Sequence, residues 1–375
     1  MDWQARCNEC GFDFHSIGGV YWDESACWVF SEAEIDVLEA ATAEVHAMCL
    51  DACDRLIRAD RFEEFSISPA FAEHVSASWR AREPSLFGRF DLAWNGEGAP
   101  KLLEYNADTP TSLPETSVAQ WFWLQDVKAR GGAGDPGADA DQFNSLHEKL
   151  IDRWRVIAKE LLPGTLYFAC VKDNEEDAGN LRYLRDTAMQ AGIPSREIFI
   201  EDLGWAGADG VFADLAGMPV ERMFKLYPWE WLVREPFGVH LLRRSLKLIE
   251  PAWKMLLSNK ALLAVLWEMH PGHPNLLPAT LDPVTLRGDY VRKPKLSREG
   301  ANVSLRRAAG AVVSGGTYGG EGFVYQAYAP IARSGDNYAV IGSWIVGNEP
   351  AGIGIREDNS PITRNTSRFV PHYFC

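Results

Sequence analysis

The sequence contains no uninterrupted apolar stretch of the roughly 18 residues or more that a membrane-spanning helix needs. Its beginning, MDWQARCNEC, has neither the basic start nor the apolar core of a secretion signal. Acidic residues outnumber basic ones by 52 to 37, and the net charge of −15 argues against nucleic-acid backbones or anionic membranes as main partners. We therefore expect a cytoplasmic protein with no membrane or nucleic-acid partner.

Cysteines are few and odd in number, with seven in 375 residues and no dense framework, so free thiols are expected. Cys7 and Cys10 form one CxxC motif. Without a second CxxC it is a weak indication of zinc, and ordinary thiols are favoured over a metal or redox role. Cys49 and Cys53 lie four residues apart in a predicted helix and are expected to face the core.

Catalytic histidine patterns are also missing. The eight histidines show neither HExxH spacing nor the context of a catalytic triad, which disfavours a hydrolase. The remaining composition, 46% hydrophobic and 24% charged, is ordinary for a globular protein that buries one large core or two ordinary ones.

Periodicity predicts a mixed protein of helices and strands. Ser31 and Glu34 form a capping box before a long amphipathic helix that ends near Leu56. Residues 1–30 are expected to be irregular with a short strand at their end. Further helices are expected over 69–82, from 114–115 onward, over 141–161 and from 259–260 onward. Strands are expected over 165–171, 197–201, 223–227, 290–294, 321–327, 337–346 and 351–356.

The segment 165–201 reads as strand, helix, strand, which predicts a βαβ unit in a parallel sheet. The glycine-rich segment 130–137 lacks the strand-then-helix context of a phosphate-binding loop. A flexible linker is therefore the favoured interpretation there.

Ionisable and hydroxyl side chains are concentrated in residues 88–115, GRFDLAWNGEGAPKLLEYNADTPTSLPE. Two strand-like runs flank a turn-rich segment, which predicts an antiparallel hairpin. Alternation places Arg89 and Asp91 on one face of the first strand, and Glu104 and Asn106 on one face of the second. If the register joins these faces, two carboxylates, an amide oxygen and a guanidinium come together.

That face has two interpretations. As an exposed hairpin it would simply be solvated, which is common for charged strand faces. As a site, Asp91, Glu104 and Asn106 would supply the hard oxygen ligands that Mg²⁺ prefers, and Arg89 would suit a phosphate or carboxylate. The polar residues that follow favour the site, because they suit hydrogen bonding to a small molecule: Asp108, Thr109, Thr111 and Ser112.

Three further features suit anion binding. Lys260 stands at a predicted helix start, where the helix dipole favours anions, so a nearby phosphate or plain solvent exposure would each account for it. Lys293 lies on a predicted strand, and the turn after it contains Gly300 among backbone donors suited to covering phosphates. Arg356 ends a nearly uncharged strand, either at an edge or aimed into a site.

These stretches resemble the synthetase domain of glutathionylspermidine synthases and their stand-alone bacterial relatives, which are ATP-grasp ligases. The resemblance begins in the hairpin and returns at 250–277, 290–303, 325–330 and 341–372, so it spans nearly the whole chain. It implies an α+β ATP-grasp fold with a preceding pre-ATP-grasp-like region. The expected parts are a helical region with the hairpin (1–130), an α/β region (131–250) and a nucleotide-binding region (251–375).

The resemblance also implies roles. ATP and Mg²⁺ would be the cofactors, with Lys260, Lys293 and the Gly300 loop on the phosphates and Gln326 with its neighbouring backbone at the adenine edge. Arg89 would face the transferred phosphoryl group, and Arg356 would contact the phosphoryl group or the reacting substrate.

The expected activity is that of a ligase forming carbon–nitrogen bonds, which joins a glutathione-like acid to a polyamine-like amine through an acyl phosphate. An amidase domain is not expected here, because the resemblance to the synthetase begins near residue 1. An inactive nucleotide-binding sensor and a ligase acting on a peptide or protein acceptor are the alternatives, and a homo-oligomer is left open.

Overall fold

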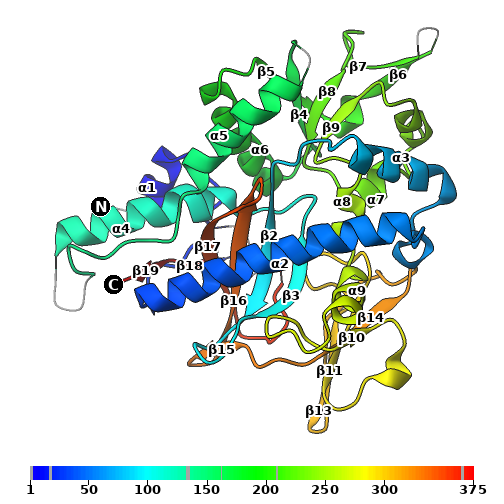
Figure 1. The fold of residues 1–375 in the computed structure, drawn as a ribbon. Helices are drawn as coiled ribbons and strands as arrows, with labels where there is room; N and C mark the ends of the chain where they lie inside the picture. The colour runs from blue at the N-terminus through cyan, green and yellow to red at the C-terminus, as the bar shows by residue number, and fades with distance from the viewer. Residues whose placement is uncertain (1–2, 17–18, 132–135, 162, 208–209, 365–366) are drawn as a thin grey trace.

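The computed structural model describes residues 3–16, 19–131, 136–161, 163–207, 210–364 and 367–375 (Figure 1). Residues 132–135 of the predicted glycine-rich linker lie outside this range. Among the described residues, no helix is long and apolar enough to cross a membrane.

The central sheet combines strands from widely separated parts of the chain. All its pairings are antiparallel, and the hairpin of the sequence analysis forms one side of it. Its order is β18 (Arg368–Val370), β17 (Glu349–Asp358), β16 (Asn337–Val346), β2 (Phe87–Ala93) and β3 (Lys101–Asn106), with β15 (Ala332–Ser334) also on β16. The predicted strands 337–346 and 351–356 are confirmed. The predicted parts 1–130 and 251–375 therefore share one sheet.

The long helix α2 (Glu32–Arg58) crosses this sheet (Figure 1). Its capping box at Ser31 and Glu34 forms as predicted, with both reciprocal hydrogen bonds present. Its buried stripe includes Cys49 and Cys53, which confirms their predicted core-facing position. The helix therefore serves as scaffold behind the hairpin.

A four-stranded parallel sheet follows, in the order β5 (Ser195–Phe199), β4 (Leu166–Cys170), β8 (Arg222–Lys225) and β9 (Lys247–Ile249). The predicted βαβ unit is confirmed, with α6 (Glu175–Gln190) as the crossover helix. The helix expected over 141–161 is α5 (Leu146–Glu160), which begins later because residues 141–145 make bridges to the C-terminal strands instead.

The third large sheet has the order β10 (Ala279–Thr280), β14 (Phe323–Ala327), β11 (Tyr290–Pro294), β12 (Ser304–Arg307) and β13 (Gly310–Val313). Strand β11 has the predicted bounds, and β14 falls within the predicted 321–327.

The remaining helices connect these sheets. Residues 1–30 contain α1 (Trp3–Glu9), which the sequence analysis missed, and β1 (Trp28–Phe30), which pairs in parallel with β19 (His372–Phe374). The helix expected from residues 114–115 starts as a π-helical turn, η2 (Glu115–Ala119), and continues as α4 (Gln120–Arg130). Others are α3 (Pro69–Arg80), α7 (Trp229–Leu232), α8 (Lys254–Leu257) and α9 (Leu262–Met269), and a small hairpin joins β6 (Gly204–Ala206) to β7 (Val211–Ala213).

Candidate active site

A cavity of about 760 Å³ lies where the three large sheets meet. The central sheet contributes β2, β3 and β17, the five-stranded sheet contributes β11 and β14, and the loops after β4 and β8 open toward it from the parallel sheet. Most of the predicted site residues line it: Arg89, Asp91, Glu104, Asn106, Thr109, Thr111, Ser112, Lys260, Lys293, Gly300, Gln326 and Arg356.

The hairpin register joins the two polar faces, as predicted. Arg89 pairs with Asn106 and Asp91 pairs with Glu104, and a bulge follows directly after Asp91. On the opposite face, Phe90 stacks on Tyr105 with ring centroids 4.0 Å apart. The apolar face thus anchors the hairpin in the core while the polar face turns to the cavity, which rules out the simply solvated hairpin.

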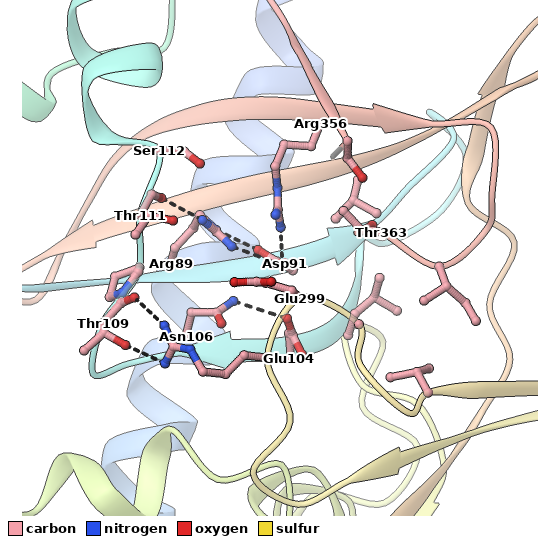
Figure 2. Close-up of a pocket in the computed structure, with 18 of the residues that line it drawn as sticks. Arg89, Asp91, Glu104, Asn106, Thr109, Thr111, Ser112, Glu299, Arg356 and Thr363 are labelled. Atoms are coloured by element: carbon pink, nitrogen blue, oxygen red, sulfur yellow. Dashed lines mark hydrogen bonds and ion pairs between the residues drawn. The ribbon is translucent and has the colours of Figure 1, made fainter. Parts of the chain in front are cut away.

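Asp91 lies between two guanidinium groups (Figure 2). Arg89 Nε donates to Asp91 Oδ1 at 2.8 Å, and Arg356 Nη2 donates to Asp91 Oδ2 at 2.9 Å. A Cβ at Gly342 on β16 would approach Arg89 Cδ to 2.9 Å, so glycine there makes room for the arginine. Both arginines predicted to be catalytic therefore meet at one carboxylate, and Arg356 is aimed into the site.

Glu104 meets the two lysines. Lys260 Nζ lies 3.1 Å from Glu104 Oε2 and donates to the Ser297 carbonyl at 2.6 Å. Burial opposes ionisation of Glu104, but the charges of Lys260 and Lys293 outweigh it and hold the pKa of this carboxyl well below its usual range. Burial also lowers the pKa of Lys293 to about 8, against the pull of Glu104.

Gln326 is placed differently from expectation. Its Oε1 accepts from Lys293 Nζ at 2.8 Å, and its Nε2 donates to the Leu102 carbonyl at 2.8 Å. Both polar ends are used within the protein, so the side chain fixes Lys293 against β3. The adenine contact of Gln326 and its neighbouring backbone stays a prediction.

The predicted substrate-binding segment divides in two. Thr109, Thr111 and Ser112 line the cavity, and Ser112 has the sparsely populated φ of 77°. Asp108 does not line it. Its carboxylate binds Lys225 Nζ at 2.5 Å and accepts from the Trp229 backbone N–H at 2.8 Å, so it secures the segment to α7 from behind.

The loop after β11 lies against the C-terminal loop. Gly300 has φ of 66°, and a Cβ there would come within 2.4 Å of the Thr363 carbonyl oxygen. Glycine is thus required by both backbone conformation and space. Arg298, two residues before Gly300 and not among the predicted site residues, donates to Thr109 Oγ1 at 2.7 Å.

Several other cavity residues were missed: Tyr21, Glu176, Asp177, Trp231 and Glu299. Glu176 and Asp177 lie in the first turn of α6, after the carboxyl end of β4, where ligands of parallel sheets commonly bind. The predicted βαβ topology could therefore have identified both residues as candidates. Burial raises the pKa of Asp177 to about 6 and also raises the pKa of Glu176.

The donor chemistry fits Mg²⁺ shared with a substrate. Among the described residues no group of three or more His, Cys, Asp or Glu forms a complete metal site. Asp91, Glu104 and Asn106 nevertheless offer two carboxylates and an amide oxygen on one face, a partial set of the kind that Mg²⁺ completes with phosphate oxygens and water. All seven cysteines are free, and burial raises the pKa of Cys7 to about 12, in line with the ordinary thiols favoured from sequence.

Comparison with known proteins gives the family. The family model described as "Glutathionylspermidine synthase preATP-grasp" matches residues 1–375. The chain belongs to the glutathionylspermidine synthase family.

Individual members of the family differ in length. A Haemophilus influenzae protein named "Putative acid--amine ligase" is 40% identical over 380 residues, covering 97% of this chain and 94% of that protein. Trypanothione synthetase of Crithidia fasciculata is 28% identical, and the bifunctional glutathionylspermidine synthetase/amidase of Escherichia coli is 25% identical. The matches cover 87% and 92% of this chain but only 53% and 58% of those longer proteins.

The fold has a solved counterpart. A glutathione synthetase-like effector from Globodera pallida, in its apo form, matches with a TM-score of 0.59 at 10% identity, covering 99% of this chain and 98% of that one. The predicted mixed α+β fold of the ATP-grasp type is confirmed.

Proposed function

We propose that the protein is an ATP-dependent acid–amine ligase that forms an amide bond through an acyl phosphate. One observation carries the proposal. The cavity gathers Arg89, Arg356, Lys260 and Lys293 around two carboxylates on a single hairpin face. With Arg298, five cationic side chains line one cavity of about 760 Å³, which suits a nucleoside triphosphate together with a carboxylate substrate.

The lysines suit the α and β phosphates. Lys260 and Lys293 are both buried, and each is held by a backbone carbonyl acceptor, Ser297 or Leu103, at 2.6 Å. Because they are positioned before any ligand arrives, little reorganisation is needed when a phosphate binds. The loop around Gly300 would close over the phosphates with its backbone N–H groups.

Asp91, Glu104 and Asn106 are the residues that would hold Mg²⁺. The ion, when bound, would neutralise phosphate charge. In this structure Asp91 and Glu104 are paired with Arg89, Arg356 and Lys260, so those cations and the metal would compete for the same carboxylate oxygens.

The arginines suit the chemical step. Joining an acid to an amine is unfavourable in water, so the acid is first activated as an acyl phosphate. Arg89 and Arg356 would contact the transferred phosphoryl group and the substrate carboxylate, and amine attack would then release phosphate. A positioned cation of this kind contributes on the order of several kcal/mol to lowering the barrier.

For substrates we propose a glutathione-like acid and a polyamine-like amine. The names of the trypanothione and glutathionylspermidine synthetases support this pair. The side chains support it as well. Thr109, Thr111 and Ser112 offer hydroxyls to a peptide acid, and Glu176 with Asp177 offers negative charge to an ammonium group.

The test is ADP release by the purified protein with Mg²⁺-ATP, in a matrix of acids that includes glutathione and amines that include spermidine. Release that requires both an acid and an amine is expected, together with an amide product by mass spectrometry. ATP binding without turnover for any pair would instead favour the nucleotide sensor or the protein-acceptor ligase. As a control for the site, Lys101→Ala changes a half-buried lysine on the same hairpin, whose Nζ contacts the Pro274 carbonyl outside the cavity, and should leave turnover unchanged.

A further inference from the structure

Glu115 is a buried carboxyl group with one unused oxygen. The residue is fully buried, and its Oε1 accepts the Tyr21 hydroxyl at 2.6 Å. Its Oε2 is also buried and has no hydrogen-bond partner among the described residues. Burying a carboxyl oxygen without a hydrogen bond destabilises the folded state, so a functional reason for Glu115 is expected.

Tyr21 connects this carboxyl to the cavity. Tyr21 lines the cavity together with Arg89, Thr111 and Ser112, and its hydroxyl donates to Glu115. The phenol oxygen is therefore the atom through which a group in the cavity can exchange a proton with the buried carboxyl.

The backbone around the pair is specialised. Glu115 begins the π-helical turn η2, a form that is frequent at functional sites. Three residues earlier, Ser112 has the positive φ of 77°, which a residue other than glycine adopts rarely. Glu115 thus lies behind the part of the cavity lining formed by Thr111 and Ser112.

The charged and titratable groups that face Glu115 come from three parts of the chain. Tyr21 and Cys7 belong to the N-terminal segment, Arg89 to β2 and Glu176 to α6. Glu176 is also near Tyr21 and lines the cavity, so an ammonium group attracted by Glu176 would lie on the Tyr21 side.

We propose that Tyr21 and Glu115 form a proton relay that removes a proton from the ammonium group of the amine substrate. This proposal rests on the ligase function proposed above. An aliphatic amine has a pKa of about 10, so at neutral pH it is charged and has no free electron pair for attack.

The relay moves two protons. One N–H bond of the ammonium breaks, its proton moves to the Tyr21 oxygen, and the Tyr21 hydroxyl proton moves to Glu115 Oε1. Because both protons move together, the phenol is never left ionised. The freed nitrogen electron pair then attacks the acyl carbon and the C–N bond forms. The C–O bond to phosphate breaks with its electrons on the leaving phosphate, which takes up the second proton that the nitrogen loses as it becomes an amide nitrogen.

The acidity of Glu115 is compatible with this role. Burial raises the pKa of Glu115 to about 8, with the nearby Glu176 acting in the same direction, against the hydrogen bond from Tyr21. A general base works best with a pKa near the working pH, where it combines basicity with a usable fraction of the ionised form.

The test compares two nucleophiles in Glu115→Gln and Tyr21→Phe. Spermidine, or whichever amine is active in the matrix, needs deprotonation, whereas hydroxylamine is already uncharged at neutral pH and traps the acyl phosphate as a hydroxamate. Both variants should lose about 100-fold or more of amine-dependent turnover. Both should keep wild-type hydroxamate formation, and the amine deficit should shrink as the pH approaches about 10, where the amine loses its proton in water.

Tyr105→Phe is the matched control. It also removes a buried tyrosine hydroxyl, but on the apolar face of the hairpin and outside the cavity lining, so it should leave both reactions unchanged. Equal losses with both nucleophiles, or no loss with the amine, would overturn the relay alone. Absence of hydroxamate in the wild-type protein would overturn the acyl phosphate itself and the relay with it. Tyr21→Phe keeps the test decisive if Glu115→Gln fails to fold.

Discussion

Asp91 and Glu104 lie directly opposite each other in the β2–β3 ladder, yet each is compensated by different cations. Asp91 is bound by Arg89 and Arg356, whereas Glu104 is bound by Lys260. Like charges opposite each other in a ladder are destabilising, so the pair is stable only because these cations converge on it. A ligand that carries anionic groups or a metal ion can therefore replace these ion pairs without leaving the buried charges uncompensated.

Removing either carboxylate should impair turnover without unfolding the protein. We expect Asp91→Asn or Glu104→Gln to lower ligase turnover at least about tenfold, because the proposed metal site loses one of its charged ligands while no core position is emptied. Steady-state ADP release measures the effect, and circular dichroism checks the fold. Near-normal turnover in either variant would contradict the metal assignment.

Nucleotide affinity should depend on the charge of Lys293. Since the pKa of this lysine is about 8, raising the pH through 8 removes its proton in the free protein and should weaken ATP binding. Lys293→Met should bind ATP weakly and without this dependence. Calorimetry between pH 7 and 9 measures both. Lys295→Met is the control, because that lysine contacts the Glu64 carbonyl outside the cavity; equal affinity of Lys293→Met and wild type would remove Lys293 from the phosphate site.

The buried pair of Asp108 and Lys225 should matter for stability more than a surface pair of equal length. Lys225→Met leaves Asp108 buried without its cation and should cost about 3–5 kcal/mol of unfolding free energy. Adding Asp108→Asn should recover part of that loss. Lys172→Met is the control, because the Lys172–Asp202 pair is also 2.5 Å long but its lysine is 44% exposed, and surface pairs contribute about 1 kcal/mol or less. Urea unfolding measures all three, and equal losses would contradict the prediction.

Glu115 should make stability fall as the pH rises. Its folded pKa is about 8 and its ordinary value is 4.5, so between these values the folded protein holds a proton that the unfolded chain has released. The stabilisation of wild type relative to Glu115→Gln is therefore complete below pH 4.5 and is lost on approaching pH 8. The difference should change by up to about 1.4 kcal/mol per pH unit. Thermal or urea unfolding at several pH values measures it, and a pH-independent difference would contradict the assigned acidity.

Local patterns predicted much of the fold and of the hairpin. Strand alternation predicted that Arg89, Asp91, Glu104 and Asn106 share a face, because side chains on a strand repeat with period two whatever the distant context. Likewise the capping box and apolar period predicted α2, since helix-start signals and periodicity act within a few residues.

Contacts between distant segments were not predictable in the same way. Tyr21 and Glu115 are 94 residues apart, and Arg298 and Thr109 are 189 apart, so no local pattern links them. Gln326 and Asp108 were placed in the site by resemblance and by composition. Only the packing of neighbouring strands and helices showed that Gln326 holds Lys293 and that Asp108 binds Lys225.

The sequence by itself determined the polar face of the hairpin, the βαβ unit and the family resemblance, because these depend on residue type at short spacing. The tertiary structure alone decided which cation meets which carboxylate, and which polar groups reach the cavity. These choices depend on how three sheets built from distant segments meet, and on which charges remain buried once they do.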